Sequence, residues 1–170
     1  MQAAIPAAKI DEAETSGSPQ YLTFVCAGEE YGVEILCVQE IKGWEGVTRV
    51  PYTPPYLLGV MNLRGVIVPV IDLRARFGLA SRSAGSTPVV IVVRVNTEGG
   101  EKTAGIVVDA VSEVYAVAPD DIKRTPDLGA SRSLACVRGL TNVDHKMVML
   151  LDVDQLVVSC LESPDAGGAD

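Results

Sequence analysis

The stretch NLRGVIVPVIDL, Asn62–Leu73, contains a polar turn, then seven residues without a charge, then an aspartate. The same arrangement recurs 80 residues later, with Asn142 and Asp152 at the positions of Asn62 and Asp72. Apolar runs of this length that are rich in Val and Ile are typical of β-strands. The chain therefore contains a duplicated strand unit, and the aspartate marks the end of that strand in each copy.

A second pair of segments, YGVEILCVQEI and AGIVVDAVSEV, is related by a different offset. Gly32 and Glu40 in the first segment match Gly105 and Glu113 in the second, an offset of 73 in each case. Two offsets indicate two similar units that differ in loop length. Each unit has about five strand-sized runs, too few for a stable open sheet with exposed edges, so each is predicted to close into a small barrel. The predicted fold is mainly β, with two small barrels packed side by side.

Apolar runs with turn signals between them occupy the middle of the chain, and the two ends lack them. We predict a disordered acidic N-terminal tail over residues 1–19 and a disordered C-terminal tail over 159–170. The small, polar segment 79–88, LASRSAGSTP, is the predicted crossover between the two halves. The domain between the tails, residues 20–158, then divides into a first barrel over about 20–80, a second barrel over about 88–152 and a closing segment over 152–158.

Two connections have predicted conformations of their own. Thr53 supplies a capping hydroxyl, Pro54 and Pro55 suit a first helical turn, and Gly59 suits a helix end. A short helix is therefore predicted between Thr53 and Gly59. Further along, Asn96–Thr103 is predicted to form a somewhat long loop.

The composition argues against nucleic acid as a partner. The chain has 22 acidic residues against 14 basic ones, a net charge of −8, whereas a duplex-binding domain has to neutralise phosphates. Aromatic residues make up only 5% of the chain, which leaves few side chains to stack on bases. A nucleic-acid-binding barrel would need a basic face, so this class is a remote alternative.

The cysteines indicate neither a metal site nor a disulfide framework. No CxxC pair and no histidine at ligand spacing accompanies Cys26, Cys37, Cys136 and Cys160. The N-terminal segment lacks the basic start and apolar run of an export signal, and no stretch approaches the roughly 18 apolar residues of a membrane span. We predict a cytoplasmic protein with reduced thiols, whose 170 residues form one core or two small subdomains that share one.

The repeated aspartates, Asp72 and Asp152, suggest a hydrolase as one alternative, because paired aspartates can share a proton and activate a water. Their neighbours Leu73 and Val153 are not the small hydroxyl-bearing residues that such a pair needs. Caps at the starts of short helical segments are the favoured interpretation. His145, the only histidine, lies in the polar turn TNVDHK and is interpreted as a solvated turn residue. The sequence contains no nucleophile elbow and no phosphate-binding loop.

Arg64 stands in the tight turn before the most apolar strand, where a structural role and a binding role have equal weight. Arg74, Arg76 and Arg82 follow nearby, against Asp72 alone. This local excess of positive charge in an acidic chain predicts a surface for an anionic partner, with a solvated loop as the alternative.

Four segments in order resemble the CheW family of chemotaxis coupling proteins: EEYGVEILCVQEIKG, GVMNLRGVIVPVIDLR, GIVVDAVSEV and RGLTNVDHKMVMLLDVDQL. The resemblance covers about residues 20–158. It implies two five-stranded, SH3-like β-barrels around a shared hydrophobic groove, in agreement with the architecture predicted from the repeat. It also implies an adaptor that has no catalytic activity and no cofactor.

The resemblance further implies the partners. In that family the adaptor joins the cytoplasmic tip of chemoreceptors to the regulatory domain of the histidine kinase CheA, and it is recruited to receptor arrays without inserting into the membrane. A CheW-like adaptor of a pilus-motility or biofilm pathway is the alternative. By the match of motifs, the implied kinase-binding residues are Glu40, Ile41 and Gly59. The implied receptor-binding groove includes Val38, Arg64, Val89, Gly105, Val111 and Gly139.

Overall fold

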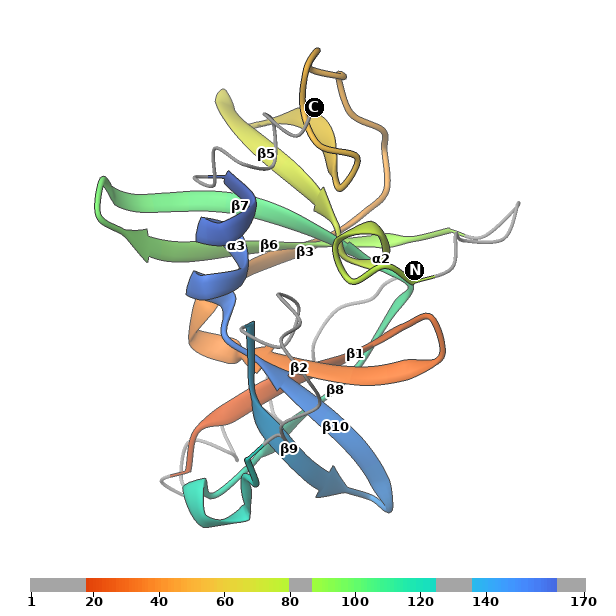
Figure 1. The fold of residues 1–170 in the computed structure, drawn as a ribbon, viewed down its shortest axis with the longest axis vertical. Coiled ribbons are helices and arrows are strands. Elements are labelled where there is room, and N and C mark those ends of the chain that lie inside the picture. The colour runs from red at the N-terminus through yellow and green to blue at the C-terminus, as the bar shows by residue number, and fades with distance from the viewer. Residues whose placement is uncertain (1–17, 80–86, 125–135, 162–170) are drawn as a thin grey trace.

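The computed structural model describes residues 18–79, 87–124 and 136–161. In this part of the chain two five-stranded sheets lie one above the other in Figure 1, with short helices beside them. The prediction of a mainly β fold with two five-stranded units is confirmed. Most of the two predicted tails and of the crossover near 79–88 lies outside the described residues.

Sheet A is the lower sheet in Figure 1 and has the strand order β8-β1-β2-β10-β9. Its strands are β1 (Gln20–Cys26), β2 (Glu29–Glu34), β8 (Ala110–Ala116), β9 (Val137–Val143) and β10 (Lys146–Leu151). Sheet B is the upper sheet and has the order β3-β6-β7-β5-β4. Its strands are β3 (Val38–Gly43), β4 (Leu57–Leu63), β5 (Val66–Asp72), β6 (Val89–Thr97) and β7 (Gly100–Val108). Neighbouring strands are antiparallel except for β2 with β10 and β5 with β7.

Each sheet combines strands from both halves of the chain, so the predicted division into a first barrel over 20–80 and a second over 88–152 is wrong. The sequence repeats are β1–β5 and β6–β10, but β1 and β2 share a sheet with β8–β10, whereas β3–β5 share one with β6 and β7. The exchange begins after β2, where the 3-10 turn Ile35–Cys37 (η1) leads the chain into β3. There Ile41 pairs with Ile91 of β6. The two repeats are thereby interlocked.

The described strand pairings leave each sheet with two edge strands, β8 and β9 in sheet A and β3 and β4 in sheet B. Closure of either sheet into a barrel by a hydrogen-bonded ladder is therefore not seen among the described residues. One isolated bridge extends each sheet: Thr48 pairs with Val60 of β4, and Lys123 pairs with Leu140 of β9. These bridges protect part of two edges that would otherwise be open to pairing with other chains.

The main hydrophobic core joins the two sheets. It contains Phe24 and Tyr31 of sheet A, whose rings stack with centroids 5.8 Å apart, together with Ile91 and Ile106 of sheet B. Smaller clusters cover the other face of each sheet. Burial of a Val, Leu or Ile side chain contributes about 1.5–3 kcal/mol, so this shared core holds both sheets in one domain.

Two hairpins that match in the repeat have the same kind of turn. Arg64 and Gly65 connect β4 to β5 with φ values of 52° and 89°, and Asp144 and His145 connect β9 to β10 with 51° and 65°. Two-residue turns with positive φ at both positions suit the right-handed twist of paired strands. The side-chain oxygen of Asn62 accepts a 2.8 Å hydrogen bond from the amide of Gly65. The polar turn read from the sequence is thus a structural unit that occurs twice.

The repeated aspartates begin the two helices, α2 (Leu73–Arg76) and α3 (Val153–Leu161). Asp72 accepts a 3.1 Å hydrogen bond from the amide of Arg74, and Asp152 accepts one of the same length from the amide of Gln155. The capping interpretation is confirmed. The boundary predicted at 158 is corrected, because α3 continues to Leu161 and buries Cys160. No helix in the described residues is long and apolar enough to cross a membrane.

The two predicted connections have other conformations than expected. The segment from Thr53 to Gly59 is not a helix, because β4 already begins at Leu57 and the Thr53 hydroxyl donates to the Val50 carbonyl. The helix signal was overridden by the pairing of this segment in sheet B. Asn96–Thr103 is not a long loop but the end of a tight hairpin, in which Thr97 pairs with Gly100.

Candidate partner-binding surfaces

Glu40, which is implied for the kinase, and Arg64, which is implied for the receptor, form a hydrogen bond with each other. Glu40 lies in the edge strand β3, and Arg64 lies in the turn beyond the opposite edge strand β4. Arg64 Nη1 donates a 2.6 Å hydrogen bond to Glu40 Oε2. The Arg64 side chain is 69% exposed and that of Glu40 is 23% exposed. This hydrogen bond raises the pKa of the Arg64 guanidinium, which stays charged.

The other two residues implied for the kinase are less accessible. Ile41 is half-buried and packs against the core that joins the sheets. Gly59 is buried, and a Cβ atom there would lie 2.2 Å from the carbonyl oxygen of Thr48. Glycine is required because the segment before β4 folds back across this point and pairs at Thr48. Of the three residues, Glu40 is the one with a charged side chain, which is 23% exposed.

The residues implied for the receptor occupy two kinds of position. Val38, Val89 and Val111 are half-buried apolar side chains that pack against the core between the sheets. Gly105 and Gly139 are buried, with a hypothetical Cβ atom 2.9 Å from Val90 Cγ1 and 2.5 Å from Ile122 Cγ2, respectively. The valines therefore lie at the margin of the core that joins the two sheets. The two glycines permit close packing below the surface.

Sequence reasoning missed several exposed apolar side chains, two of which follow Arg64 closely in the chain. Val66 and Ile67 directly follow the turn that contains Arg64, and they are 55% and 60% exposed. Leu36 and Tyr52 elsewhere are 83% and 99% exposed. The sequence held no signal for this, because Val66 and Ile67 belong to the apolar run that otherwise enters the core. Exposed apolar side chains are typical of interaction surfaces.

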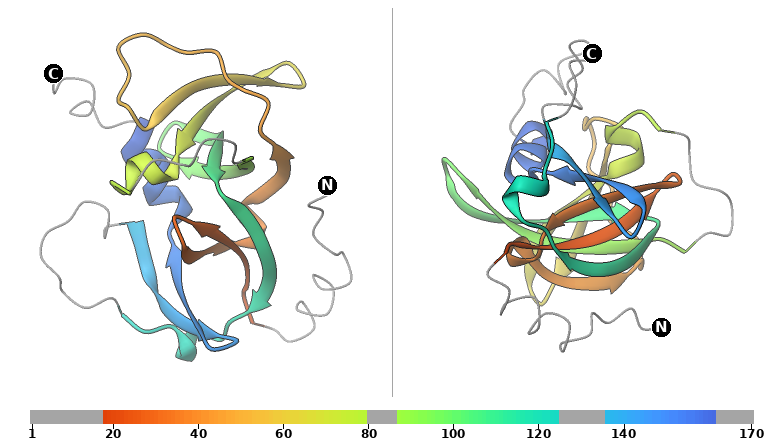
Figure 2. Two further views of the ribbon diagram at one scale, coloured as in Figure 1. Left: turned by 90° about the vertical axis from the view of Figure 1, so that its right-hand side faces the viewer. Right: turned by 90° about the horizontal axis from the view of Figure 1, so that it is seen from below.

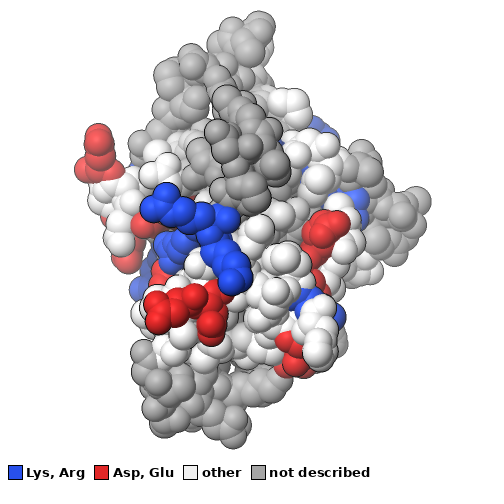
Figure 3. All heavy atoms as spheres, turned by 60° about the horizontal axis from the view of Figure 1, so that its bottom comes forward, with Lys and Arg blue, Asp and Glu red and all other residues white. Residues whose placement is uncertain are grey.

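The expected basic surface around residues 64–82 is not formed by the arginines that the structure describes. Arg64 is paired with Glu40, Arg74 is paired with Asp109, and Arg76 donates to Ser159 with its guanidinium 5.5 Å from the centre of the Tyr56 ring. The fourth, Arg82, lies outside the described residues. Figure 3 likewise shows Lys and Arg side chains directly against Asp and Glu on one face. Two of these three arginines are thus neutralised by carboxylates far away in the chain.

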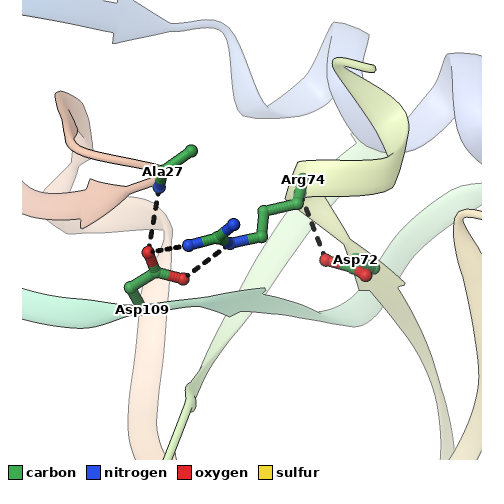
Figure 4. A network of polar contacts seen from close by, with 4 residues as sticks. All are labelled: Ala27, Asp72, Arg74 and Asp109. Atoms are coloured by element: carbon green, nitrogen blue, oxygen red, sulfur yellow. Dashed lines mark hydrogen bonds and ion pairs between the residues drawn. The ribbon is translucent and has the colours of Figure 1, made fainter. Parts of the chain in front are cut away.

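One such pair connects the two sheets (Figure 4). Arg74 of α2 donates to Asp109 through Nε at 3.0 Å and through Nη2 at 2.6 Å. The same carboxylate accepts a 2.9 Å hydrogen bond from the amide of Ala27, in the turn between β1 and β2. The bond to Asp109 raises the pKa of Arg74. Sequence reasoning missed Asp109, although it is an isolated carboxylate between two apolar runs.

The residues considered for hydrolysis lie at helix caps and in a turn. Asp72 and Asp152 each cap their own helix, and His145 is an exposed turn residue, as the sequence predicts. Among the described residues no three His, Cys, Asp or Glu side chains converge to hold a metal ion. In the described ranges, the two aspartates thus act as helix caps and are not arranged as a pair that activates a water.

Comparison with known proteins finds relatives that carry the same family name. The family model for the CheW-like domain matches residues 20–160. The chain is 40% identical over 146 residues to the chemotaxis protein CheW of Klebsiella aerogenes, covering 86% of this chain and 85% of that protein. It is 34% identical over 145 residues to the chemotaxis protein CheW of Rhizobium meliloti, covering 85% of this chain and 91% of that protein.

The fold agrees with these sequence matches. The crystal structure of the scaffolding protein TtCheW from Thermoanaerobacter tengcongensis is similar to this structure with a TM-score of 0.72 and 34% sequence identity. The match covers 82% of this chain and 87% of the other.

Proposed function

This chain belongs to the CheW family of chemotaxis scaffolding proteins, and we propose that it couples chemoreceptors to the histidine kinase CheA by binding both. As a member of this family it is an adaptor and not an enzyme. The proposed partners are the regulatory domain of the kinase and the cytoplasmic tip of the receptors. Receptor state would then control the kinase through a shift of populations at a protein interface.

The observation that carries this proposal is the surface pair Glu40–Arg64, together with the exposed apolar residues Val66 and Ile67 that follow Arg64 in the chain. Charged groups at an interface fix register and orientation, whereas apolar side chains supply buried area. Glu40 belongs to the proposed kinase surface with Ile41 and Gly59. Arg64 donates a hydrogen bond to Glu40. A partner that binds one of these side chains therefore changes the hydrogen bonding of the other.

For the receptor we propose a groove lined by Val38, Val89 and Val111. Half-buried valines at the boundary of the two sheets suit an amphipathic helical hairpin, which docks by burying an apolar stripe and fixes its register with a few polar contacts. Arg64 supplies such a contact. In this proposal Gly105 and Gly139 act indirectly, by allowing the strands behind the groove to pack closely.

Calorimetric titration with the CheA regulatory domain tests the kinase surface. Binding at micromolar Kd that Glu40→Ala weakens is the expected result. A matched control is Glu30→Ala, which removes a carboxylate of sheet A that lies 3.9 Å from Lys146 and should leave the affinity unchanged. Equal loss in both variants would contradict the assignment of the surface to Glu40. Binding only to the kinase of a pilus-motility or biofilm pathway would move the protein to that pathway.

A further inference from the structure

Asp109 occupies the point where the chain passes from sheet B to sheet A. It stands between Val108, the last residue of β7, and Ala110, the first residue of β8. Its backbone amide donates a 3.0 Å hydrogen bond to the carbonyl of Val25 in sheet A. Its carboxylate accepts from the amide of Ala27, in the turn between β1 and β2 of sheet A, and from Arg74 of α2, the helix that follows β5 of sheet B. The crossover is therefore held from both sheets at once.

The two hydrogen bonds from Arg74 make this connection directional. Apolar contacts between the sheets are non-directional and tolerate small sliding and rotation. A guanidinium that donates two parallel bonds to one carboxylate fixes both distance and angle. The side chains of Arg74 and Asp109 are only 14% and 24% exposed, so water competes weakly for these bonds. Arg76, two residues along α2, adds a 3.1 Å bond to Ser159 of α3.

The crossover also separates two valines of the proposed receptor groove. Val89 of sheet B pairs with Val108, directly before Asp109. Val111, two residues after Asp109, pairs with Phe24 within sheet A. The position of Asp109 thus sets how far apart these two apolar side chains lie. A helical hairpin that contacts both valines needs that spacing before it binds.

We propose that Arg74 and Asp109 are positioning residues, which hold sheets A and B at the angle that the receptor groove requires without contacting the receptor themselves. The proposal deepens the function proposed above and rests on it for its binding readout. It predicts that loss of the Arg74–Asp109 bonds loosens the angle between the sheets. If the competent orientation then falls to about one tenth of the population, the apparent affinity for the receptor falls about tenfold.

The test compares Arg74→Gln with Arg138→Gln in the full chain. Arg138 is the matched control, because it pairs at 3.2 Å with Glu34 of β2 and lies 4.0 Å from Asp152, which directly follows β10, so both ion pairs stay at sheet A. Residual dipolar couplings of backbone amides are measured for each sheet in weakly aligned samples. In the wild type and in Arg138→Gln, one alignment tensor should fit both sheets. In Arg74→Gln the tensors of the two sheets should differ.

Affinity for a receptor-tip fragment is measured on the same proteins, with the CheA regulatory domain as the second ligand. Arg74→Gln should lose about tenfold in receptor affinity, while its kinase affinity and both affinities of Arg138→Gln stay at the wild-type values. One common tensor in Arg74→Gln, or unchanged receptor affinity, would overturn the proposal. If Arg74→Gln does not fold, Asp109→Asn and Arg74→Lys, which keep the shape or the charge, are held to the same criteria. A wild type that binds neither ligand refutes the proposed function, whereas the tensors still decide the positioning role.

Discussion

Glu40 and Arg64 lie on opposite sides of sheet B in strand order, yet Arg64 Nη1 lies 2.6 Å from Glu40 Oε2. The second repeat has a counterpart in sheet A. There Asp144, 80 residues beyond Arg64, accepts a 3.0 Å hydrogen bond from the hydroxyl of Tyr115 in the edge strand β8. Each sheet is therefore curved so strongly that the turn of its last hairpin contacts the edge strand on the opposite side of the sheet, β3 in sheet B and β8 in sheet A. Side chains make this contact where the described strands form no ladder.

Replacing Arg64 by Ala should weaken receptor-dependent activation of the kinase and leave Tm nearly unchanged. The side chain is 69% exposed and its ion pair with Glu40 lies at the surface, so its loss should cost the fold little while it removes the proposed receptor contact. Kinase assays with receptor-containing membranes and thermal melting of the same preparation check both parts. A large fall in Tm would instead assign Arg64 to the structure.

Exchanging the two charges separates direct contact from structural pairing. The double variant Glu40→Arg, Arg64→Glu restores an ion pair across the same gap with its direction reversed. If partners read the individual charges, binding stays impaired although Tm remains at the wild-type value. Recovery of binding in the double variant would show that the partners need only the pair and not its polarity.

Gly59→Ala should lower the free energy of unfolding by about 1–3 kcal/mol, the usual range for an overpacked site. The added methyl group would lie 2.2 Å from the backbone oxygen of Thr48, so the paired segment has to shift. Urea denaturation measures the change. Gly43→Ala is the control, because a Cβ atom at Gly43 meets nothing within 4 Å, and its effect should stay within about 0.5 kcal/mol. Equal stability of the two variants would contradict the close contact.

High pH should destabilise the protein through Tyr31. Burial, with smaller contributions from Cys26 and Glu29, raises the pKa of Tyr31 to about 12 from an ordinary value near 10. The pKa of Tyr31 is therefore higher in the folded protein than in the unfolded chain. The contribution of the protonated tyrosine to stability is fully present below about pH 10 and is lost as the pH rises to about 12. Urea denaturation across this range measures it, and Tyr31→Phe should reduce the slope. An unchanged slope in that variant would assign the pH dependence to other groups, such as Tyr115.

Local signals made part of this structure predictable from sequence. The turn at Arg64 and Gly65 and the cap at Asp72 depend on residues within a few positions of each other, and both were recognised. Strand exchange between the repeats was not, because the pairing of β3 with β6 joins segments that no local pattern connects. The same holds for the bond between Arg74 and Asp109, which are 35 residues apart.

The candidate site shows the same division between local and distant information. The valines at 38, 89 and 111 came from motif matching, and all three are half-buried, whereas their role in receptor binding stays a prediction. For glycines, a sequence does not distinguish an exposed turn from close packing. Gly59, Gly105 and Gly139 are all buried against neighbours that other parts of the chain supply. Their effects on binding therefore have to be separated from their effects on stability.

Substitutions at Asp72 distinguish a helix cap from a catalytic carboxylate. Asp72→Ala removes the acceptor for the Arg74 amide and should cost about 0.5–2 kcal/mol of unfolding free energy, whereas Asp72→Asn keeps an acceptor and should cost little. Urea denaturation gives both values, and assays with ester and phosphoester substrates are run in parallel on the wild type and both variants. A catalytic carboxylate would behave in the opposite way, because Asn would abolish turnover while the fold stayed intact. Any hydrolysis by the wild type that Asp72→Asn removes would therefore contradict the capping role as the reason for this residue.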